Sequence, residues 1–381
     1  MYDPDNRILT DCDIREAIQH NCDISDARDH GIYSMCSMVL KLRNFYKWEQ
    51  RLEPWQEPDA PHLLDWIDRK EDSWERLEAD SFESLKMGDA ALPPFEVEAV
   101  NGALEGTGLH YGAGYGRSLK AVFFLAETRD RIEVEGCPVH ILDAELAREL
   151  AAPFAMAQNG RIIIRLESLR YFLWDHIQEL RSSCKSSYLY SLKSYGLLKD
   201  GVLDQQAFKE RLDDIVEQEL ALFIHHEIGE LLETTLDSSH VRSVIGRFPA
   251  SVLEFVCRAV KDVLADTHPR GVLGHICRER KSSSLGLYVS FLDGLRQELF
   301  PEMNNAWKQF HQNHDWRGIE SARDRCRGRL LETARDIVDI AEHADGRPDT
   351  EIIACFNARV LVPLGLEMPP EAVGAAVVQE N

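Results

Sequence analysis

The sequence predicts a mainly α-helical protein with a small antiparallel β-sheet insertion, an α+β fold whose N-terminal and C-terminal parts are helical. Apolar residues recur at helical spacing towards both ends of the chain, whereas the middle contains short strand-like runs. Glycine and proline are concentrated at the start of that middle part, where they favour turns. With 44% hydrophobic and 28% charged residues in 381, the composition indicates a globular protein of two or three domains.

We expect four regions along the chain. Residues 1–95 form an N-terminal helical region, and residues 96–200 form a small α+β region with a glycine-rich loop at 102–118. Residues 201–345 form a C-terminal helical domain. Residues 346–381 form a C-terminal extension that is expected to be partly disordered, because chain termini order only when they are tied down.

The N-terminal region is predicted to contain three helices. Asp26 or Asp29 is placed to cap the second of them, which has a broad apolar face. Four of the seven tryptophans lie in this region, and aromatic residues at helical spacing indicate core packing more than a ligand pocket. The predicted helices cover Asp11–Asn21, Ile32–Leu52 and His62–Ala79.

The middle region is predicted to contain the sheet. Its glycines favour a flexible turn over a phosphate-binding loop, because no Gly-Lys-Ser/Thr sequence ends the segment. A hairpin turn is expected at Glu127–Asp130, and Asp143–Gln158 is predicted to be a helix with Asp143 as its cap. The expected strands cover Lys120–Ala126, Arg131–Leu142 and Arg161–Leu166.

The C-terminal domain is predicted to be helical almost throughout. Pro249 suits the first turn of a helix that continues through Asp266 and ends before Pro269. The helices expected in this domain cover Glu219–Asp237, Pro249–Asp266, Ser284–Phe300, Glu302–Asn313 and Gly318–Glu342.

The helix predicted at Glu219–Asp237 has an unusual charge pattern. From Leu212 to Val241 there are eight acidic residues and no lysine or arginine. Like charges one turn apart destabilise a helix by about 0.2–0.5 kcal/mol per pair, so either positive charge comes from elsewhere or the helix tolerates the repulsion. A bound cation, a basic segment packed across the helix, or solvent ions can supply it.

The same helix contains the candidate metal ligands and a candidate catalytic residue. His226 and Glu230 are i,i+4 neighbours, so both side chains can reach one ion, with His225 or His268 as a further ligand. Histidine with carboxylate suits a divalent metal such as zinc, iron or manganese. Glu227 is the candidate general base on a metal-bound water.

The stretch His226-Glu227-Ile-Gly-Glu230 resembles the zincin signature, in which two histidines on one helical turn hold zinc and the intervening glutamate is the general base. Glu230 stands where that signature has its second histidine, which weakens both the zinc assignment and the protease interpretation. The metal-free alternative is that Arg278 and Arg280 pair with Glu230 and Glu233.

The net charge of −22 and the isoelectric point near 5.1 argue against sequence-independent binding to nucleic acid or to an anionic membrane, and they are compatible with a basic protein partner. The nine scattered cysteines contain no Cys-x-x-Cys, so no disulfide framework or zinc ribbon is predicted. With no signal-peptide pattern and no apolar run long enough to span a membrane, we expect a cytoplasmic protein.

Two segments, Tyr33–Glu49 and His225–Glu230, are similar to an uncharacterised family of bacterial cytosolic proteins. The resemblance implies no activity, because the function of that family is unknown, and no catalytic residue follows from it. Two functional hypotheses therefore stay open. The first is a metal-dependent enzyme, most simply a hydrolase. The second is a non-enzymatic helical interaction or chaperone-like protein with an acidic partner-binding face.

Overall fold

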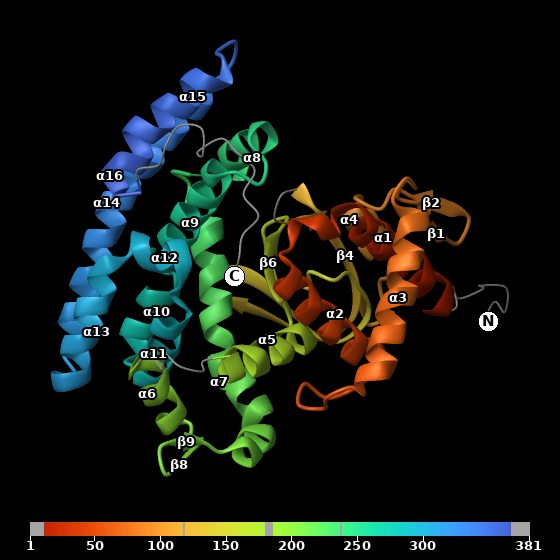
Figure 1. Ribbon diagram of the computed structural model, residues 1–381, viewed down its shortest axis with the longest axis horizontal. Coiled ribbons are helices and arrows are strands. Elements are labelled where there is room, and N and C mark those ends of the chain that lie inside the picture. Colours follow the sequence, from red (N-terminus) through yellow and green to blue (C-terminus); the bar gives the residue numbers. More distant parts are fainter. Residues whose placement is uncertain (1–10, 117–118, 180–185, 237, 367–381) are drawn as a thin grey trace. The chain divides into compact units, whose positions relative to one another are not determined.

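The computed structural model describes residues 11–116, 119–179, 186–236 and 238–366. These residues form two compact units (Figure 1). The first unit contains the described residues up to Glu133 together with Pro138–Asp175, and the second contains Val134–Cys137 together with the described residues from His176 onward. The expected class, mainly α with a β-sheet, is confirmed.

The first unit combines helices with a five-stranded sheet of order β3-β4-β5-β7-β6. Its neighbouring strands include a parallel pair, β5 with β7, so the sheet is larger than expected and not wholly antiparallel. Its helices are α1 (Asp11–Asp29), α2 (Met35–Glu49), α3 (Ala60–Leu77) and α4 (Val97–Ala103), with a short 3-10 turn at His30–Ile32. Its strands are β1 (Leu85–Met87), β2 (Ala90–Leu92), β3 (Leu109–Tyr115), β4 (Ala121–Val134), β5 (Cys137–Arg148), β6 (Ala155–Gln158) and β7 (Arg161–Arg165).

Three local predictions for this unit were wrong. Asp143–Gln158 is not a helix, because the strand β5 continues to Arg148 and β6 follows at Ala155. The turn expected at Glu127–Asp130 is absent, because β4 continues through these residues. The glycine-rich loop expected at 102–118 contains strand β3, in which Gly112 lies opposite Phe124. A Cβ atom on Gly112 would lie 2.1 Å from the Phe124 ring, so glycine makes room for that ring.

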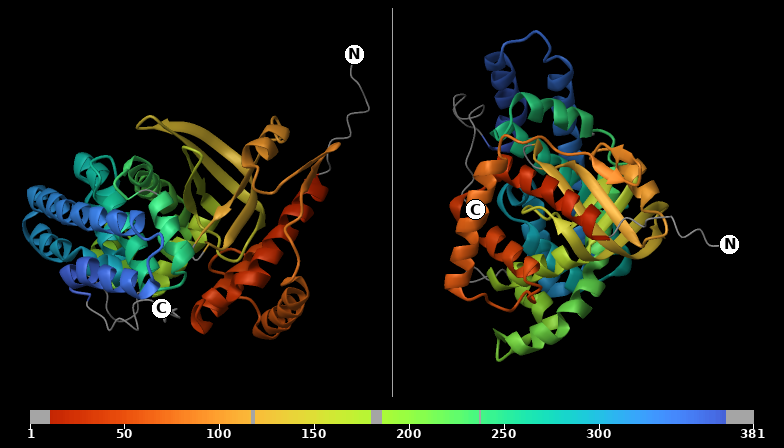
Figure 2. Two further views of the ribbon diagram at one scale, coloured as in Figure 1. Left: turned by 90° about the horizontal axis from the view of Figure 1, so that it is seen from above. Right: turned by 90° about the vertical axis from the view of Figure 1, so that its right-hand side faces the viewer.

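Helix α1 packs against strand β4, as Figure 2 shows for the red helix beside the yellow sheet. The Sγ atom of Cys22 lies 3.2 Å from the carbonyl oxygen of Phe123, and the Ser25 hydroxyl donates to Ala121. Buried beneath this helix, the Lys120 ammonium lies 2.9 Å from the Asp26 carboxylate. Asp26 also accepts hydrogen bonds from the backbone N–H of Leu150, so α1 is joined to the sheet by buried polar contacts.

The second unit is built from helices with one short hairpin. Helices α13 and α14 pack side by side, as the blue ribbons of Figure 1 show, and α9 packs against both α7 and α14. Its elements are α6 (Ser186–Ser194), β8 (Leu198–Lys199), β9 (Val202–Leu203), α7 (Gln205–Leu232), α8 (Ser238–Arg247), α9 (Val252–Thr267), α10 (Val272–Glu279), α11 (Ser282–Phe291), α12 (Gly294–Leu299), α13 (Pro301–Asn313), α14 (Trp316–Glu342), α15 (Asp349–Phe356), a π-helical turn (Asn357–Leu361) and α16 (Val362–Leu364).

Helix α5 (Leu166–Glu179) contains the division between the units, which falls between Asp175 and His176. Among the described residues, no helix has both the length and the apolar character that crossing a membrane requires. Most of the C-terminal extension predicted to be partly disordered, from residue 367 onward, lies outside the described residues.

Candidate metal site

Helix α7 contains most of the predicted site residues. The Asp204 side chain caps it by accepting hydrogen bonds from the backbone N–H groups of Gln206 and Ala207. The helix begins 14 residues earlier than the predicted Glu219, and its second half packs against α9 and α10. His225 and Glu227 are therefore buried in the second unit, where polar groups require partners.

Gly229 allows α7 to approach α9 closely. A Cβ atom at this position would lie 2.1 Å from the backbone oxygen of Ala265, a distance that no side chain tolerates. The close approach brings His226, one turn before Gly229, against Asp266, the residue that follows Ala265. A single small residue at the helix crossing thus positions the two side chains at the centre of the site.

Both ring nitrogens of His226 face carboxylates. Nδ1 donates to the Asp266 carboxylate at 2.8 Å, and Nε2 lies 3.7 Å from the Glu230 carboxylate. Burial alone lowers the pKa of His226, but the charges of Asp266, Glu227 and Glu230 outweigh it and raise the pKa to about 10. His226 is therefore an imidazolium at neutral pH in the metal-free protein.

A third side chain, Asp262 of α9, completes a possible ligand set. His226, Glu230 and Asp262 each offer one ligand atom, and these atoms lie within 4.8 Å of one another. The three residues are half-buried, so the group lies near solvent. Burial raises the pKa of Asp262, and the negative charge of Glu230 adds to that effect.

Basic side chains and one tyrosine surround these carboxylates. Lys261 forms a close ion pair with Glu230, and Tyr288 donates a hydrogen bond to Asp266 at 3.2 Å. Burial lowers the pKa of Arg296, but the charges of Asp266 and Asp262 outweigh it and raise the pKa. The site is thus largely neutralised by the protein itself.

Glu227, the predicted general base, is 6% exposed. Burial raises the pKa of Glu227, and the neighbouring Glu230 charge adds to the effect, to about 8. The carboxyl group is therefore mainly protonated at pH 7, and it accepts a proton only when the pH rises or a nearby positive charge lowers its pKa.

The structure places the other two predicted ligands elsewhere. The Nδ1 atom of His225 donates to the carbonyl oxygen of Arg270 at 2.8 Å, and its ring stacks on His275 with centroids 4.1 Å apart. The Nδ1 atom of His268 accepts the backbone N–H of Arg270 at 3.2 Å. Burial lowers the pKa of both histidines. Among the described residues, neither belongs to the group formed by His226, Glu230 and Asp262.

The arginines expected to neutralise the acidic stripe have other partners, so that pairing was wrong. Arg278 pairs with Glu135 at 2.9 Å, and Arg280 pairs with Glu320 at 3.1 Å. Three of the acidic residues of this stripe are instead paired with basic side chains from other segments of the second unit. The observed pairs are Glu230 with Lys261, Glu233 with Arg327 at 2.5 Å and Glu219 with Lys281 at 3.2 Å.

Asp262 is not among the ligands that the sequence predicts, although it is an i,i+4 neighbour of Asp266 on the predicted helix Pro249–Asp266. Nothing in the local pattern distinguished these two aspartates from His268, which lies at the end of the same helix. The distinguishing feature is the crossing of α7 and α9 at Gly229, a contact between distant parts of the chain.

The fold and the site define a mainly helical α+β protein with a mixed histidine and carboxylate cluster among its described residues. Two family descriptions match the chain: residues 13–165 match the N-terminal domain of the family of unknown function DUF6866, and residues 170–359 match its C-terminal domain. The chain therefore belongs to this family, which confirms the predicted resemblance to a family of unknown function. No curated protein and no solved structure matches it.

Proposed function

We propose that this protein binds one divalent metal ion, zinc, iron or manganese, through His226, Glu230 and Asp262, and that it acts as a metal-dependent hydrolase. The observation that carries the proposal is the convergence of three possible ligand atoms within 4.8 Å of one another. For comparison, two ligands about 2.1 Å from one zinc ion lie roughly 3.4 Å apart in a tetrahedral site.

The hydrogen bond from His226 to Asp266 supports this proposal. In many metal sites, the ligating histidine donates its second ring N–H to a carboxylate, which fixes the ring and makes the other nitrogen a better donor. Here Nδ1 donates to Asp266, so Nε2 is the nitrogen directed to Glu230. Asp266 is therefore proposed as the group that orients the ligand, rather than as a ligand itself.

Two groups compete with a metal ion in this arrangement. The proton on Nε2 of His226 must leave before that nitrogen can bind a metal, and the Lys261 ammonium must move away from Glu230. Metal binding is thus expected to release about one proton and to strengthen as the pH rises from about 7 towards 10.

Three protein ligands leave open positions on the ion, as in catalytic rather than structural zinc sites. A bound ion would lower the pKa of a coordinated water to about 7 and so provide a nucleophile for hydrolysis. The same positive charge would lower the pKa of Glu227, which converts this carboxyl group from a proton donor to a proton acceptor.

The test is metal analysis of protein purified without a histidine tag, followed by titration calorimetry with Zn²⁺ and Mn²⁺ in two buffers of different ionisation enthalpy. We expect about one metal per chain with proton release, and a loss of at least about tenfold in affinity in His226→Gln and Asp262→Asn. Asp214→Asn is the matched control, because Asp214 is an exposed aspartate on α7, the helix that contains His226. Absence of binding, or equal binding by all three variants, would refute the proposed site.

A second candidate function is a non-enzymatic interaction with a basic protein partner. Helix α3 supports it, because Asp65, Asp68, Glu71 and Glu75 are exposed on that helix. Asp65 and Asp68 also line a surface hollow beside Trp66. Titration with an oligolysine peptide at low salt tests it: Asp68→Asn should weaken binding and Asp214→Asn should not. Equal binding by both variants would count against a specific surface.

A further inference from the structure

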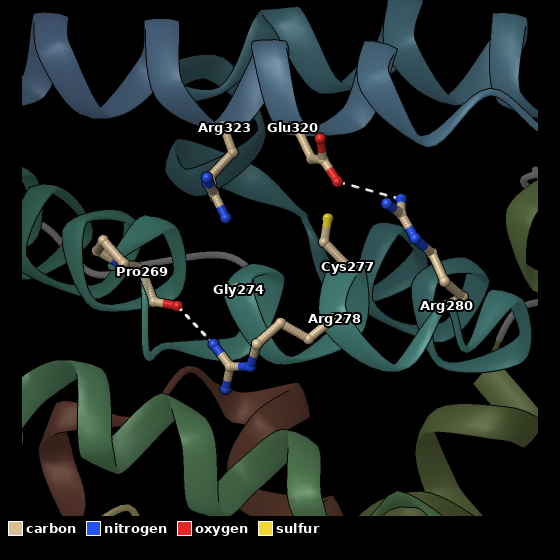
Figure 3. Close-up of a pocket in the computed structure, with 7 residues that line it drawn as sticks. All are labelled: Pro269, Gly274, Cys277, Arg278, Arg280, Glu320 and Arg323. Carbon is tan, nitrogen blue, oxygen red and sulfur yellow. Dashed lines mark hydrogen bonds and ion pairs between the residues drawn. The ribbon is translucent and has the colours of Figure 1, made fainter.

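A pocket of about 320 Å³ lies between α10 and α14 in the second unit (Figure 3). Arg278 and Arg280 reach it from the α10 side, and Arg323 reaches it from α14. Its lining includes one carboxylate, Glu320, and small groups such as Gly274. This volume is at the lower end of the range of about 300–1,000 Å³ that small-molecule sites occupy.

The partners of the α10 arginines occupy only part of their hydrogen-bonding capacity. Arg278 donates to the carbonyl oxygen of Pro269 at 2.8 Å and to Glu135 at 2.9 Å, and Arg280 forms an ion pair with Glu320 at 3.1 Å. A guanidinium group has five N–H donors, so each arginine retains donors for a further acceptor alongside these contacts.

Arg323 adds a third guanidinium from the opposite wall. Figure 3 shows its side chain extending from α14 towards α10. It pairs with Asp324, the next residue on α14, with one terminal nitrogen 2.8 Å from the carboxylate and Nε donating to it at 2.9 Å, which leaves its remaining N–H donors for another acceptor. The Arg323 side chain itself is only 18% exposed, which fixes its guanidinium at the pocket more firmly than a surface arginine.

Arg280 adopts a backbone conformation that arginine seldom takes. Its φ of 54° lies in the left-handed region, where glycine or asparagine is favoured at the end of a helix. The side chain lies over the Trp316 ring, 5.4 Å from the ring centroid, and is thereby held beside α14. An arginine therefore stands at a position where backbone preference alone would favour a different residue.

The charge of the lining selects the ligand class. Three guanidinium groups and one carboxylate, Glu320, line the pocket. Glu135 and Asp324 pair with Arg278 and Arg323 from outside the lining and offset part of their charge, so the guanidinium groups are the charged donors that the pocket itself presents to a ligand. A phosphate monoester carries about −1.5 to −2 charges at pH 7, and arginine recognises phosphate oxygens in a bidentate manner. Burial raises the pKa of the Cys277 thiol to about 11, so this pocket residue is neutral and does not repel an anion.

We propose that the pocket between α10 and α14 binds the phosphate group of a small phosphorylated molecule through Arg278, Arg280 and Arg323. Gly274 and Cys277 then contact the rest of the ligand, and Glu320 competes with the phosphate for Arg280. The site uses none of the residues of the His226 cluster, so its occupancy does not depend on a bound metal.

The test is titration calorimetry of the full chain in EDTA with inorganic phosphate and with phenyl phosphate, at constant ionic strength. Arg323→Gln is expected to weaken phosphate binding about tenfold, because it removes a charge-assisted contact. Glu320→Gln is expected to strengthen it about two- to fivefold, because the competing carboxylate is lost. A purely structural role for these residues would not predict a gain in affinity.

Arg325→Gln is the matched control, because Arg325 is an exposed arginine on the same helix, two residues from Arg323. It should bind phosphate as the unaltered protein does. Equal weakening in Arg323→Gln and Arg325→Gln would show binding to general surface charge and overturn the proposal. Failure of both phosphate and phenyl phosphate to bind at millimolar concentration, with circular dichroism confirming the fold, would overturn it too.

Discussion

Both units contain a cluster of carboxylates and basic side chains, but the two clusters differ in how far solvent reaches them. In the first unit, Glu145 receives two hydrogen bonds from Arg165, at 2.8 and 3.2 Å, and one from the Ser168 hydroxyl. The Glu145 and Arg165 side chains are fully buried. In the second unit, the side chains of His226 and Glu230 are 23% and 21% exposed.

The comparison shows that clusters of similar ionisable side chains can have different roles, depending on whether solvent reaches them. A fully buried, bidentate pair such as Arg165 with Glu145 has no route for an ion and is expected to hold the sheet in place. The His226 cluster is partly exposed. The Nε2 proton of His226 can dissociate, and the Lys261 ammonium group can move away from Glu230. The predictions below test this difference, from the largest expected effect to the smallest.

Arg165→Met should produce the largest loss of stability. It leaves the buried Glu145 carboxylate without its main partner, which typically costs about 3–5 kcal/mol in the free energy of unfolding. Urea denaturation measures the loss. Arg161→Met is the control, because Arg161, at the other end of β7, pairs with the exposed Glu98 and should contribute less than about 1 kcal/mol. Equal effects in the two variants would mean that the buried pair is not structural.

Gly229→Ala should destabilise the second unit and distort the His226 cluster. The added methyl group would lie 2.1 Å from the Ala265 oxygen, so α7 and α9 must separate at a cost of about 1–3 kcal/mol. Gly328→Ala is the control: Gly328 is an exposed glycine within α14 with open space around it, and alanine there should stabilise the protein by about 0.5–1 kcal/mol. Thermal unfolding should show a lower melting temperature for Gly229→Ala and a higher one for Gly328→Ala.

Stability should fall as the pH rises above neutrality. The pKa of His226 is raised to about 10 in the folded protein, so its stabilising contribution is complete below about 6.5 and is lost as the pH approaches 10. The raised pKa of Glu227 acts in the same direction but at lower pH: its stabilising contribution is complete below about pH 4.5, its ordinary pKa, and is lost by about pH 8. Urea titrations at several pH values should show a flatter profile for His226→Gln, and an unchanged profile would contradict this assignment.

Lys261→Met should have the smallest effect on stability, and it should raise the affinity for metal rather than lower it. The ion pair with Glu230 is partly exposed, so its loss should change the free energy of unfolding by less than about 1 kcal/mol. Affinity for Zn²⁺ should rise, because the ammonium group no longer competes for Glu230. Lys308→Met, at an exposed position on α13, should alter neither quantity. A fall in Zn²⁺ affinity in Lys261→Met would argue against competition at Glu230.

The periodicity of apolar residues predicted the fold class correctly, but it did not predict the second half of strand β5. Residues 143–148 contain alanine, leucine and glutamate, which favour helix, yet they form part of β5. The structure buries Glu145 and Arg148 there beside Arg165, so tertiary ion pairing overrides the local preference. A charged strand in a core lacks the apolar alternation by which strands are recognised in a sequence.

The candidate site was foreseeable only in part, for a related reason. His226 and Glu230 share a helical face, and that relation is visible in the i,i+4 spacing. Asp266 and Lys261 lie 40 and 31 residues further along the chain, and their approach depends on the crossing of α7 and α9. Charge excess alone indicated that counter-ions were required, without indicating which ones.

The buried contacts of Asp26 also constrain the order of events during synthesis. Its hydrogen-bond donor Leu150 is 124 residues further along the chain. At about 5–20 residues per second, the ribosome delivers that partner roughly 6–25 s after Asp26. The buried environment of α1, which includes Ile18 and Cys22, therefore cannot be completed until most of the first unit has been synthesised.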